Sequence, residues 1–234
     1  MTYFKYFLKN SFKIIYLYGP LETIIFFKNF FQYKKEIDSK ISIIKNDFEI
    51  TNPGENFNKY LDTNYWVFEN LKRIYLLNLH KKNTQSVLDL GAGAGYFAYL
   101  CQKYGHNVIA LDMDNNPMYN SIIKLLGINR INHKISFGQA LPLDNNLKFN
   151  LITAFMICFN NHKQKDLWHI EEWHWFIKHL FTRLQPDGEI FLSFNEESPN
   201  EPIDEMLSNC LNEHLVTSNH LDYLLAKNVS KSTT

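Results

Sequence analysis

The middle of the chain alternates short apolar runs with stretches of helical periodicity. Residues 87–90 (Val-Leu-Asp-Leu) form a brief apolar run, which is typical of a buried strand. A further strand is predicted over 107–112, and helices are predicted over 64–79, 96–103 and 170–180. Another helix is predicted to begin at Pro117, directly after the turn signal Asn115-Asn116.

Three glycines follow the first strand at every second position: Gly91, Gly93 and Gly95. Glycine lets the backbone turn sharply and lets a ligand approach where a Cβ atom would clash. A strand, a glycine turn and a helix N-terminus together form a nucleotide-sized site at the carboxyl end of a sheet. The dinucleotide fingerprint places its third glycine three positions after the second, whereas Gly95 comes two positions after Gly93. The spacing therefore disfavours an NAD site.

Asp89 precedes these glycines, and the resulting D-x-G-x-G-x-G pattern resembles motif I of the class I S-adenosylmethionine-dependent methyltransferases. The resemblance implies that S-adenosylmethionine (SAM) is bound by Asp89, Gly91, Ala92, Gly93 and Gly95. SAM has no pyrophosphate, so the loop must fit a ribose and a zwitterionic tail, whose ammonium group a carboxylate receives directly or through water. The alternative is a glycine turn that serves packing only.

A second acidic residue ends the next predicted strand. Asp112 lies about 20 residues beyond the glycine loop, where an acid is placed to hold ribose hydroxyls. Met113 is expected to lie against the adenine or in ordinary packing. Asp114 is the weaker acidic candidate, because the turn before Pro117 begins there.

Two later segments extend the resemblance. Residues 134–143 resemble the motif that lines the adenine, and the contacts it implies are Gln139, Ala140 and Leu141. Residues 147–155 resemble the strand whose end faces the transferring methyl group, and there the implied cofactor contact is Ala154.

The chain departs from the family pattern at Gln139 and Asn150, where the family usually has Asp, and at Asp187, which replaces a glycine before the fifth strand. A glutamine amide can still bind the adenine amino group, so the first departure is compatible with SAM.

The resemblance covers residues 57–195 and implies a Rossmann-like three-layer α/β/α sandwich. Its sheet is mostly parallel, with strand order 3-2-1-4-5-7-6; the short tail leaves open a trimmed final hairpin. We expect three regions: an N-terminal helical extension and linker (1–58), the SAM-binding core (59–195), and an acidic loop with a C-terminal element (196–234).

Charge and cysteine content limit the classes of binding partner and the cellular location that we expect. Basic and acidic residues balance at 24 each, whereas a nucleic-acid methyltransferase normally presents a basic surface, so nucleic acid is disfavoured as a partner. Three widely spaced cysteines indicate neither a metal site nor a disulfide framework and fit a reducing, cytoplasmic location. We also expect no secretory signal.

Residues 1–35 combine aromatic and aliphatic residues with six lysines and one acid, Glu22. A helix is predicted up to the breaking pair Gly19-Pro20, followed by a second helix to about residue 33 and a polar linker over 36–58. No uncharged run is long enough for a membrane span. Two interpretations remain: an amphipathic segment peripheral to the inner face of a membrane, or a cap or homodimerisation element.

Residues 159–175 concentrate polar, titratable and aromatic groups after the fourth strand. Histidine is the usual base near neutral pH, so the candidate catalytic residues are His162 and His169. Candidate substrate contacts are Asn160 and Trp168 here, and Tyr60 and Trp66 before the core. No known metal-ligand spacing is matched, and we expect no metal.

The sequence therefore predicts a SAM-dependent methyltransferase acting on a hydroxyl of a small molecule or glycan, similar to enzymes of bacterial surface-polysaccharide synthesis. The first alternative is N-methylation of an amino sugar or small amine, in which the acidic stretch 196–205 would take part. The second is a non-catalytic scaffold, which the departures at Gln139 and Asn150 favour.

Overall fold

The computed structural model describes the main chain of residues 3–51, 56–157, 168–194, 214–219 and 222–226. The chain divides into two compact units, Met1–Leu77 and Asn78–Thr234. The first contains α1 (Tyr3–Thr51), the 3-10 helix η1 (Asn56–Leu61) and α2 (Thr63–Leu76). The second contains β1 (Ser86–Leu90), α3 (Tyr96–Lys103), β2 (Asn107–Asp112), α4 (Pro117–Leu126), β3 (Arg130–Asn132), β4 (Phe149–Ile157), α5 (Ile170–Thr182), β5 (Leu184–Phe194), β6 (Leu215–Asn219) and β7 (Asp222–Ala226).

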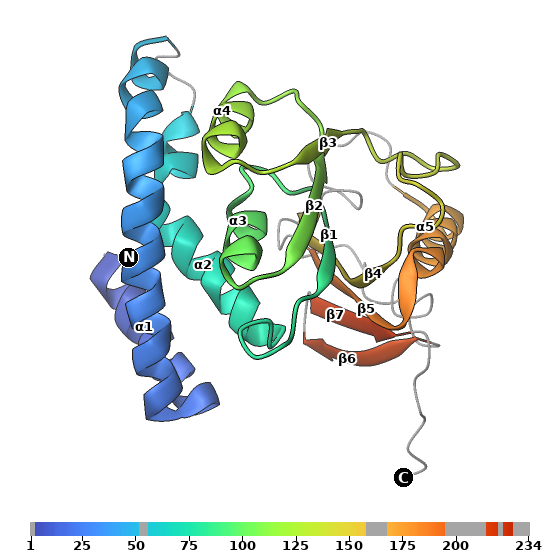
Figure 1. The fold of residues 1–234 in the computed structure, drawn as a ribbon, viewed down its shortest axis with the longest axis horizontal. Coiled ribbons are helices and arrows are strands. Elements are labelled where there is room, and N and C mark those ends of the chain that lie inside the picture. The colour runs from blue at the N-terminus through green and yellow to red at the C-terminus, as the bar shows by residue number, and fades with distance from the viewer. Residues whose placement is uncertain (1–2, 52–55, 158–167, 195–213, 220–221, 227–234) are drawn as a thin grey trace. The chain divides into compact units, whose positions relative to one another are not determined.

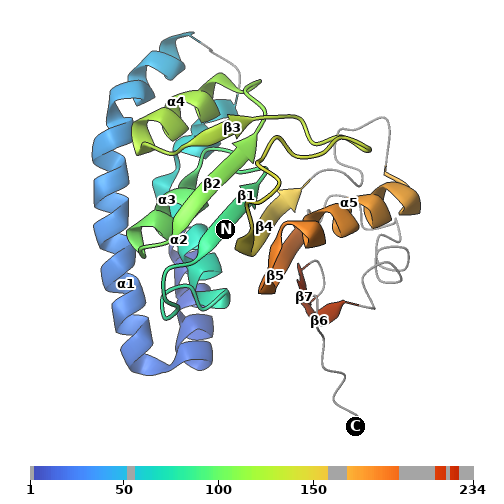
Figure 2. The same cartoon turned by 45° about the vertical axis from the view of Figure 1, so that its right-hand side comes forward.

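The second unit is built on one seven-stranded sheet of order β3-β2-β1-β4-β5-β7-β6 (Figure 1). Strands β1 to β5 pair in parallel, whereas β7 is antiparallel to both β5 and β6. Helices α3 and α4 cover one face of the sheet and α5 covers the other (Figure 2). The predicted three-layer α/β/α sandwich and its strand order are therefore confirmed.

The final hairpin, which the short tail left open, is present. β7 pairs with β5 from Glu189 opposite Ala226 to Ser193 opposite Asp222, and β6 pairs with β7. The sheet is complete, so a trimmed hairpin is excluded.

The strands at the centre of the sheet are buried on both faces, which explains their nearly continuous apolar sequences. In β1, Val87, Leu88 and Leu90 are fully buried, and even Asp89 is only 2% exposed. On the α5 side, the buried residues recur at helical spacing and pack with β4 and β5: Trp173, Phe176, Ile177 and Leu180. The helix predicted over residues 170–180 is confirmed as α5.

In the first unit, α1 changes direction at Gly19, whose backbone (φ 79°, ψ 171°) is not helical. The predicted break is confirmed, but the second helix runs to Thr51, so the linker predicted over residues 36–58 was wrong for residues 36–51. The physical reason is that Ile37 and Ile41, 0% and 4% exposed, continue the buried stripe of the preceding turns. The polar residues between them hid this periodicity.

The buried stripe of α1 packs edge-on against aromatic rings of α2. Phe26 meets Phe68 and Tyr75, with ring centroids 5.4 and 5.0 Å apart, and Phe30 meets Phe68 at 5.6 Å.

None of the helices in the described ranges combines the length and the apolar character that a membrane crossing requires.

His106, which precedes β2, is a buried histidine held as the neutral imidazole. It is 3% exposed; its Nδ1 accepts a hydrogen bond from the Gln85 N–H at 3.1 Å, and its Nε2 lies 2.9 Å from the Leu79 carbonyl oxygen. Because Nδ1 accepts, the proton must sit on Nε2. Burial lowers the pKa of His106 below its ordinary value, while the Leu79 carbonyl opposes this shift and the charge of Lys82 adds to it.

We predict that the protein loses stability as the pH falls below about 6.5, the ordinary histidine value. Below that pH the unfolded chain binds a proton that folded His106 resists, so the free energy of unfolding decreases until the pH also passes the lower folded pKa. Thermal unfolding between about pH 7 and pH 5 should show a smaller loss for His106→Gln than for the unaltered protein. His174→Gln, at an exposed position of α5, is the control and should retain the full loss. An equal loss in His106→Gln would contradict the assignment.

Candidate functional site

The loops that carry the motif residues meet at one edge of the sheet. Strands β2, β1 and β4 are parallel neighbours, so their carboxyl ends lie together. The strand order reverses between β1 and β4, and such a switch point opens a crevice in which ligands bind. The glycine loop follows β1, the Met113 loop follows β2, and residues 133–148 follow β3.

The glycine loop wraps over the end of β2 and uses its own N–H groups to do so. Gly91, Gly93 and Gly95 all have positive φ, at 67°, 54° and 78°. The N–H donors bond as follows: Gly91 to Leu111 O (2.8 Å), Ala92 to Leu111 O (3.3 Å), Gly93 to Asp112 Oδ2 (2.6 Å) and Gly95 to Ala92 O (2.9 Å). A pyrophosphate needs such donors directed at the ligand. These four N–H groups are therefore not directed at a ligand.

Gly95 is required for packing as well as for conformation. It lies just before α3, and a Cβ atom added there would lie 2.8 Å from Ile123 Cγ1 of α4. At Gly93 a Cβ atom would lie 3.8 Å from the Tyr119 ring, an ordinary contact. Tyr119, half-buried beside the loop, is a further candidate for the site that no sequence motif marked.

Asp112 is half-buried at the end of β2, and each of its carboxylate oxygens accepts one backbone N–H. Oδ2 binds the Gly93 N–H at 2.6 Å, and Oδ1 binds the Met113 N–H at 2.7 Å. Burial raises the pKa of the Asp112 carboxyl above its ordinary value, which these two N–H bonds and the charge of Arg130 oppose. A carboxylate oxygen has capacity for a second donor, so the pair fits two ribose hydroxyls.

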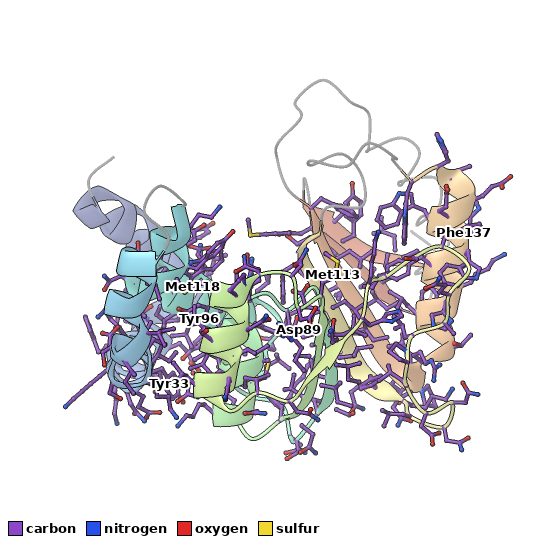
Figure 3. All side chains as sticks on the ribbon, turned by 90° about the horizontal axis from the view of Figure 1, so that it is seen from above. Tyr33, Asp89, Tyr96, Met113, Met118 and Phe137 are labelled. Carbon is purple, nitrogen blue, oxygen red and sulfur yellow. The ribbon has the colours of Figure 1, made fainter. Side chains whose placement is uncertain are left out.

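The loop after β2 is shaped by the sequence that follows it. Asn116 accepts hydrogen bonds from the N–H groups of Met118 (3.0 Å) and Tyr119 (3.1 Å), which starts α4 at Pro117 as predicted. Met113 is half-buried in this loop and is labelled in Figure 3. Asp114 is exposed.

Asp89 lies within β1, beneath the glycine loop. One of its oxygens accepts the Thr153 hydroxyl at 2.9 Å, from the neighbouring position of β4. A carboxylate only 2% exposed can reach a ligand ammonium group through water more readily than directly. Thr153 thus holds the Asp89 carboxylate in place, although no sequence signal marked it.

The loop after β3 places two of the predicted adenine contacts at the surface. Gln139 and Ala140 are exposed, whereas Leu141 is 3% exposed and packs in the core. The Leu141 N–H donates to Nε2 of His179 on α5 at 3.2 Å. Burial, reinforced by the charge of Arg183, lowers the pKa of His179 and so favours the neutral acceptor.

Aromatic contacts reinforce this loop. Trp175 stacks on the His179 ring, with centroids 5.4 Å apart and planes 2° apart, and meets Phe137 edge-on at 5.6 Å. Figure 3 shows Phe137 beside α5. His179 was missed because its partner Leu141 is distant in the sequence. Its spacing of four residues from Trp175 on a predicted helix was the available signal.

Asn150, one of the departures from the family pattern, lies at the opposite end of the sheet. It is near the start of β4, where its Oδ1 accepts the Ser86 N–H at 2.9 Å, just as β1 begins. The amide therefore joins two strands at the amino edge and lies away from the glycine loop.

The carboxyl end of β4 carries a backbone irregularity. Ala154 is fully buried opposite Leu90, and the β4–β5 register shifts between Ala154 and Ile157. Within this shift Met156 has φ 55° and is 41% exposed. A left-handed non-glycine residue costs about 1–2 kcal/mol, and such strain gathers at functional sites. Met156 is a further candidate with no sequence signal.

The structure describes only some of the residues that are candidates to contact the methyl acceptor. His162 and Asn160 lie outside the described residues. His169 is exposed immediately before α5, and its N–H donates to Glu172 Oε2 at 2.6 Å. Trp168 packs edge-on against Trp173 and Phe176, with both centroid distances 5.2 Å, and its part in substrate binding stays a prediction.

Tyr60 and Trp66 belong to the first unit and contact each other. Their rings stack with centroids 6.0 Å apart, and the Trp66 indole N–H donates to the Lys59 carbonyl at 2.7 Å. Their part in substrate binding stays a prediction. Within the described ranges, no three His, Cys, Asp or Glu side chains converge as metal ligands would.

We predict that Gly95→Ala destabilises the protein by about 3 kcal/mol, because it adds both backbone strain and a clash with Ile123. Gly105→Ala is the matched control: Gly105 also has positive φ (84°), but its Cβ would meet no atom within 4 Å. It should cost only about 1 kcal/mol. Urea unfolding measures both, and equal losses would show that Ile123 simply moves aside.

Comparison with known proteins agrees with this geometry. The sequence model of the methyltransferase domain matches residues 63–224. No curated protein matches the chain.

Among solved structures, the chain is similar to DesVI of Streptomyces venezuelae (16% identity, TM-score 0.42), covering 56% of this chain and 51% of that one. It is also similar to PH0226 of Pyrococcus horikoshii OT3 (16% identity, TM-score 0.49; 77% and 97% covered). A third is SAM-bound CalS10, an amino pentose methyltransferase from Micromonospora echinaspora (18% identity, TM-score 0.42; 56% and 51% covered). The chain thus spans about half the length of DesVI. Since the domain match covers more than half of the sequence, the chain belongs to the methyltransferase-domain family, whose members use SAM.

Proposed function

We propose that this protein transfers a methyl group from SAM to a hydroxyl group of a small molecule or glycan. The observation that carries the proposal is the junction of the glycine loop with Asp112. Loop N–H groups at positions 91, 92, 93 and 95 are bonded within the protein, while the half-buried carboxylate retains acceptor capacity. This pattern suits a ribose without a pyrophosphate, as in SAM.

Each part of the site has a distinct task in this proposal. Asp112 holds the ribose hydroxyls, and Gln139 offers its side-chain oxygen to the adenine amino group. Asp89 orients the ammonium group of the methionine tail through water. His179 and Leu141 hold the loop that carries Gln139. When bound, SAM supplies an electrophilic methyl group on a sulfur that is already a good leaving group.

The remaining requirement is to align the acceptor oxygen with that methyl group, and alignment supplies much of the rate. In this proposal the carboxyl end of β4 contributes Met156 to the acceptor side. The candidates that would accept the hydroxyl proton are His162 and then His169, which immediately precedes α5, and Asn160 is a candidate contact of the acceptor. We place the reaction in the cytoplasm, with glycans of surface-polysaccharide synthesis as the leading acceptors.

The two alternative functions are N-methylation and a non-catalytic scaffold. N-methylation of an amino sugar or small amine would need an acidic residue to hold the cationic acceptor, and the stretch 196–205 supplies candidates outside the described residues. A non-catalytic scaffold was favoured by Gln139 and Asn150. Asn150 now supports it less, because its amide has a structural partner in the Ser86 N–H.

Calorimetric titration of the purified chain with SAM, S-adenosylhomocysteine and NAD tests the cofactor. We predict micromolar binding of both sulfur compounds and none of NAD. Asp112→Ala should weaken binding roughly a hundredfold, because it removes charged acceptors for two hydroxyls. Asp114→Ala, at the exposed neighbouring acid, should change little.

Circular dichroism must show that Asp112→Ala is folded. Binding of NAD, or unchanged affinity in this variant, would refute the ribose assignment. A folded chain that binds none of the three compounds would favour the scaffold.

A second prediction concerns the base. Hydroxylated sugars and amino sugars are screened for release of S-adenosylhomocysteine; with a hydroxyl acceptor, His169→Ala should lower kcat roughly a hundredfold and leave cofactor affinity unchanged. His174→Ala, exposed on α5, is the matched control. His162→Ala is measured beside it. If neither candidate lowers kcat, no histidine base operates there, and turnover of amines alone would establish the N-methylation alternative.

A further inference from the structure

Beyond the break at Gly19, one face of α1 is fully used in packing. Its buried residues recur every three or four positions: Thr23, Phe26, Phe30, Tyr33, Ile37 and Ile41. Phe26 and Phe30 make the ring contacts with α2 described above. The Thr23 hydroxyl also donates to the Gly19 carbonyl at 2.7 Å, which satisfies an acceptor at the break.

The opposite face of the same helix is also apolar but exposed. Residues 21, 24, 28, 31 and 35 follow helical spacing and share one strip, here called the outer strip: Leu21, Ile24, Lys28, Phe31 and Lys35. Leu21, Ile24 and Phe31 are 70%, 67% and 59% exposed. Large apolar side chains grouped in this way mark a surface that meets something apolar.

The apolar surface continues across the break. Tyr16 is 89% exposed and Leu17 55% exposed on the preceding helical arm. Both stand within one or two turns of Leu21 along the chain. The bend in α1 therefore carries exposed apolar side chains on both of its arms.

The charges of the outer strip have one sign. Lys28 and Lys35 are exposed, and in the part of the chain that the structure describes neither has an acidic partner. Lys34, by contrast, is paired with Asp38 off the strip. The surrounding sequence continues the bias, because residues 1–35 contain six lysines and one acid.

We propose that the outer strip docks α1 on the surface of an anionic lipid bilayer, parallel to the membrane plane. Leu21, Ile24 and Phe31 enter the boundary between headgroups and acyl chains, while lysine stems lie along it and their ammonium groups meet lipid phosphates. Lysines interspersed with apolar residues on one strip, without an acid among them, complement a negatively charged apolar interface. Docking does not depend on the proposed methyl transfer.

Vesicle flotation with the full chain tests the proposal, using vesicles of phosphatidylcholine alone and vesicles containing phosphatidylglycerol. The chain should bind the anionic vesicles roughly tenfold more tightly, and high salt should remove most of this preference. The double variant Leu21→Glu/Ile24→Glu should lose binding. Lys28→Gln/Lys35→Gln keeps every apolar side chain and should lose the preference for anionic vesicles.

Ser39→Glu/Ser42→Glu is the matched control, because it adds the same two charges at exposed positions further along α1. It should bind as the unaltered chain does. Equal binding by Leu21→Glu/Ile24→Glu and this control would overturn the proposal. So would a dimer, measured by sedimentation, that the same variant dissociates while the unaltered chain fails to bind vesicles. Since no SAM is present, failure here leaves the proposed activity untouched.

Discussion

The hydrogen bond from the Gly93 N–H to Asp112 Oδ2 joins the glycine loop to the end of β2, and the geometry of the cofactor site depends on it. The register of the sheet makes the bond possible, because Leu90 pairs with Leu111 and so the two strands end level. The glycine loop then folds over the end of β2. Its N–H groups donate hydrogen bonds to the Leu111 carbonyl oxygen and to the Asp112 carboxylate. Four N–H groups of the loop are thus bonded within the protein, and in the proposed function the ligand would be held by the shape of the loop and by Asp112.

The features that the sequence predicted are those with strict local requirements. Short apolar runs, which favour buried strands, predicted β1 and β2. The pair Asn116-Pro117 predicted where α4 begins. What escaped prediction depends on distant partners. The helix beyond residue 36 exists because Ile37 and Ile41 pack in the first unit, although their polar neighbours suggest a linker. The left-handed conformation of Met156 arises from a register shift between β4 and β5, which periodicity cannot reveal.

Two of the three departures from the family pattern, Gln139 and Asn150, lie in different parts of the fold, and this changes what they mean. A polar substitution near the amino end of β4 can be absorbed by pairing, and Asn150 does so with the Ser86 N–H. Gln139 lies in the exposed loop after β3, beside the Leu141 N–H that His179 holds. The bond from α5 reaches the backbone at Leu141 and involves no atom of the Gln139 side chain. In the proposed function, Gln in place of Asp would change the charge offered to the adenine more than the shape of the loop.

The surroundings of Asp112 explain why a carboxylate is suited to the end of β2. Burial raises its pKa, so holding the charge in the protein alone has a cost that two backbone N–H bonds offset in part. Hydroxyl donors from a ribose would complete the hydrogen bonding of both oxygens and favour the charged form further. Binding a ribose would therefore lower the pKa of Asp112, and by linkage ionised Asp112 would bind it more tightly than the protonated form. In the proposed function, affinity for a ribose would thus come from a carboxylate whose hydrogen bonding the fold itself completes only in part.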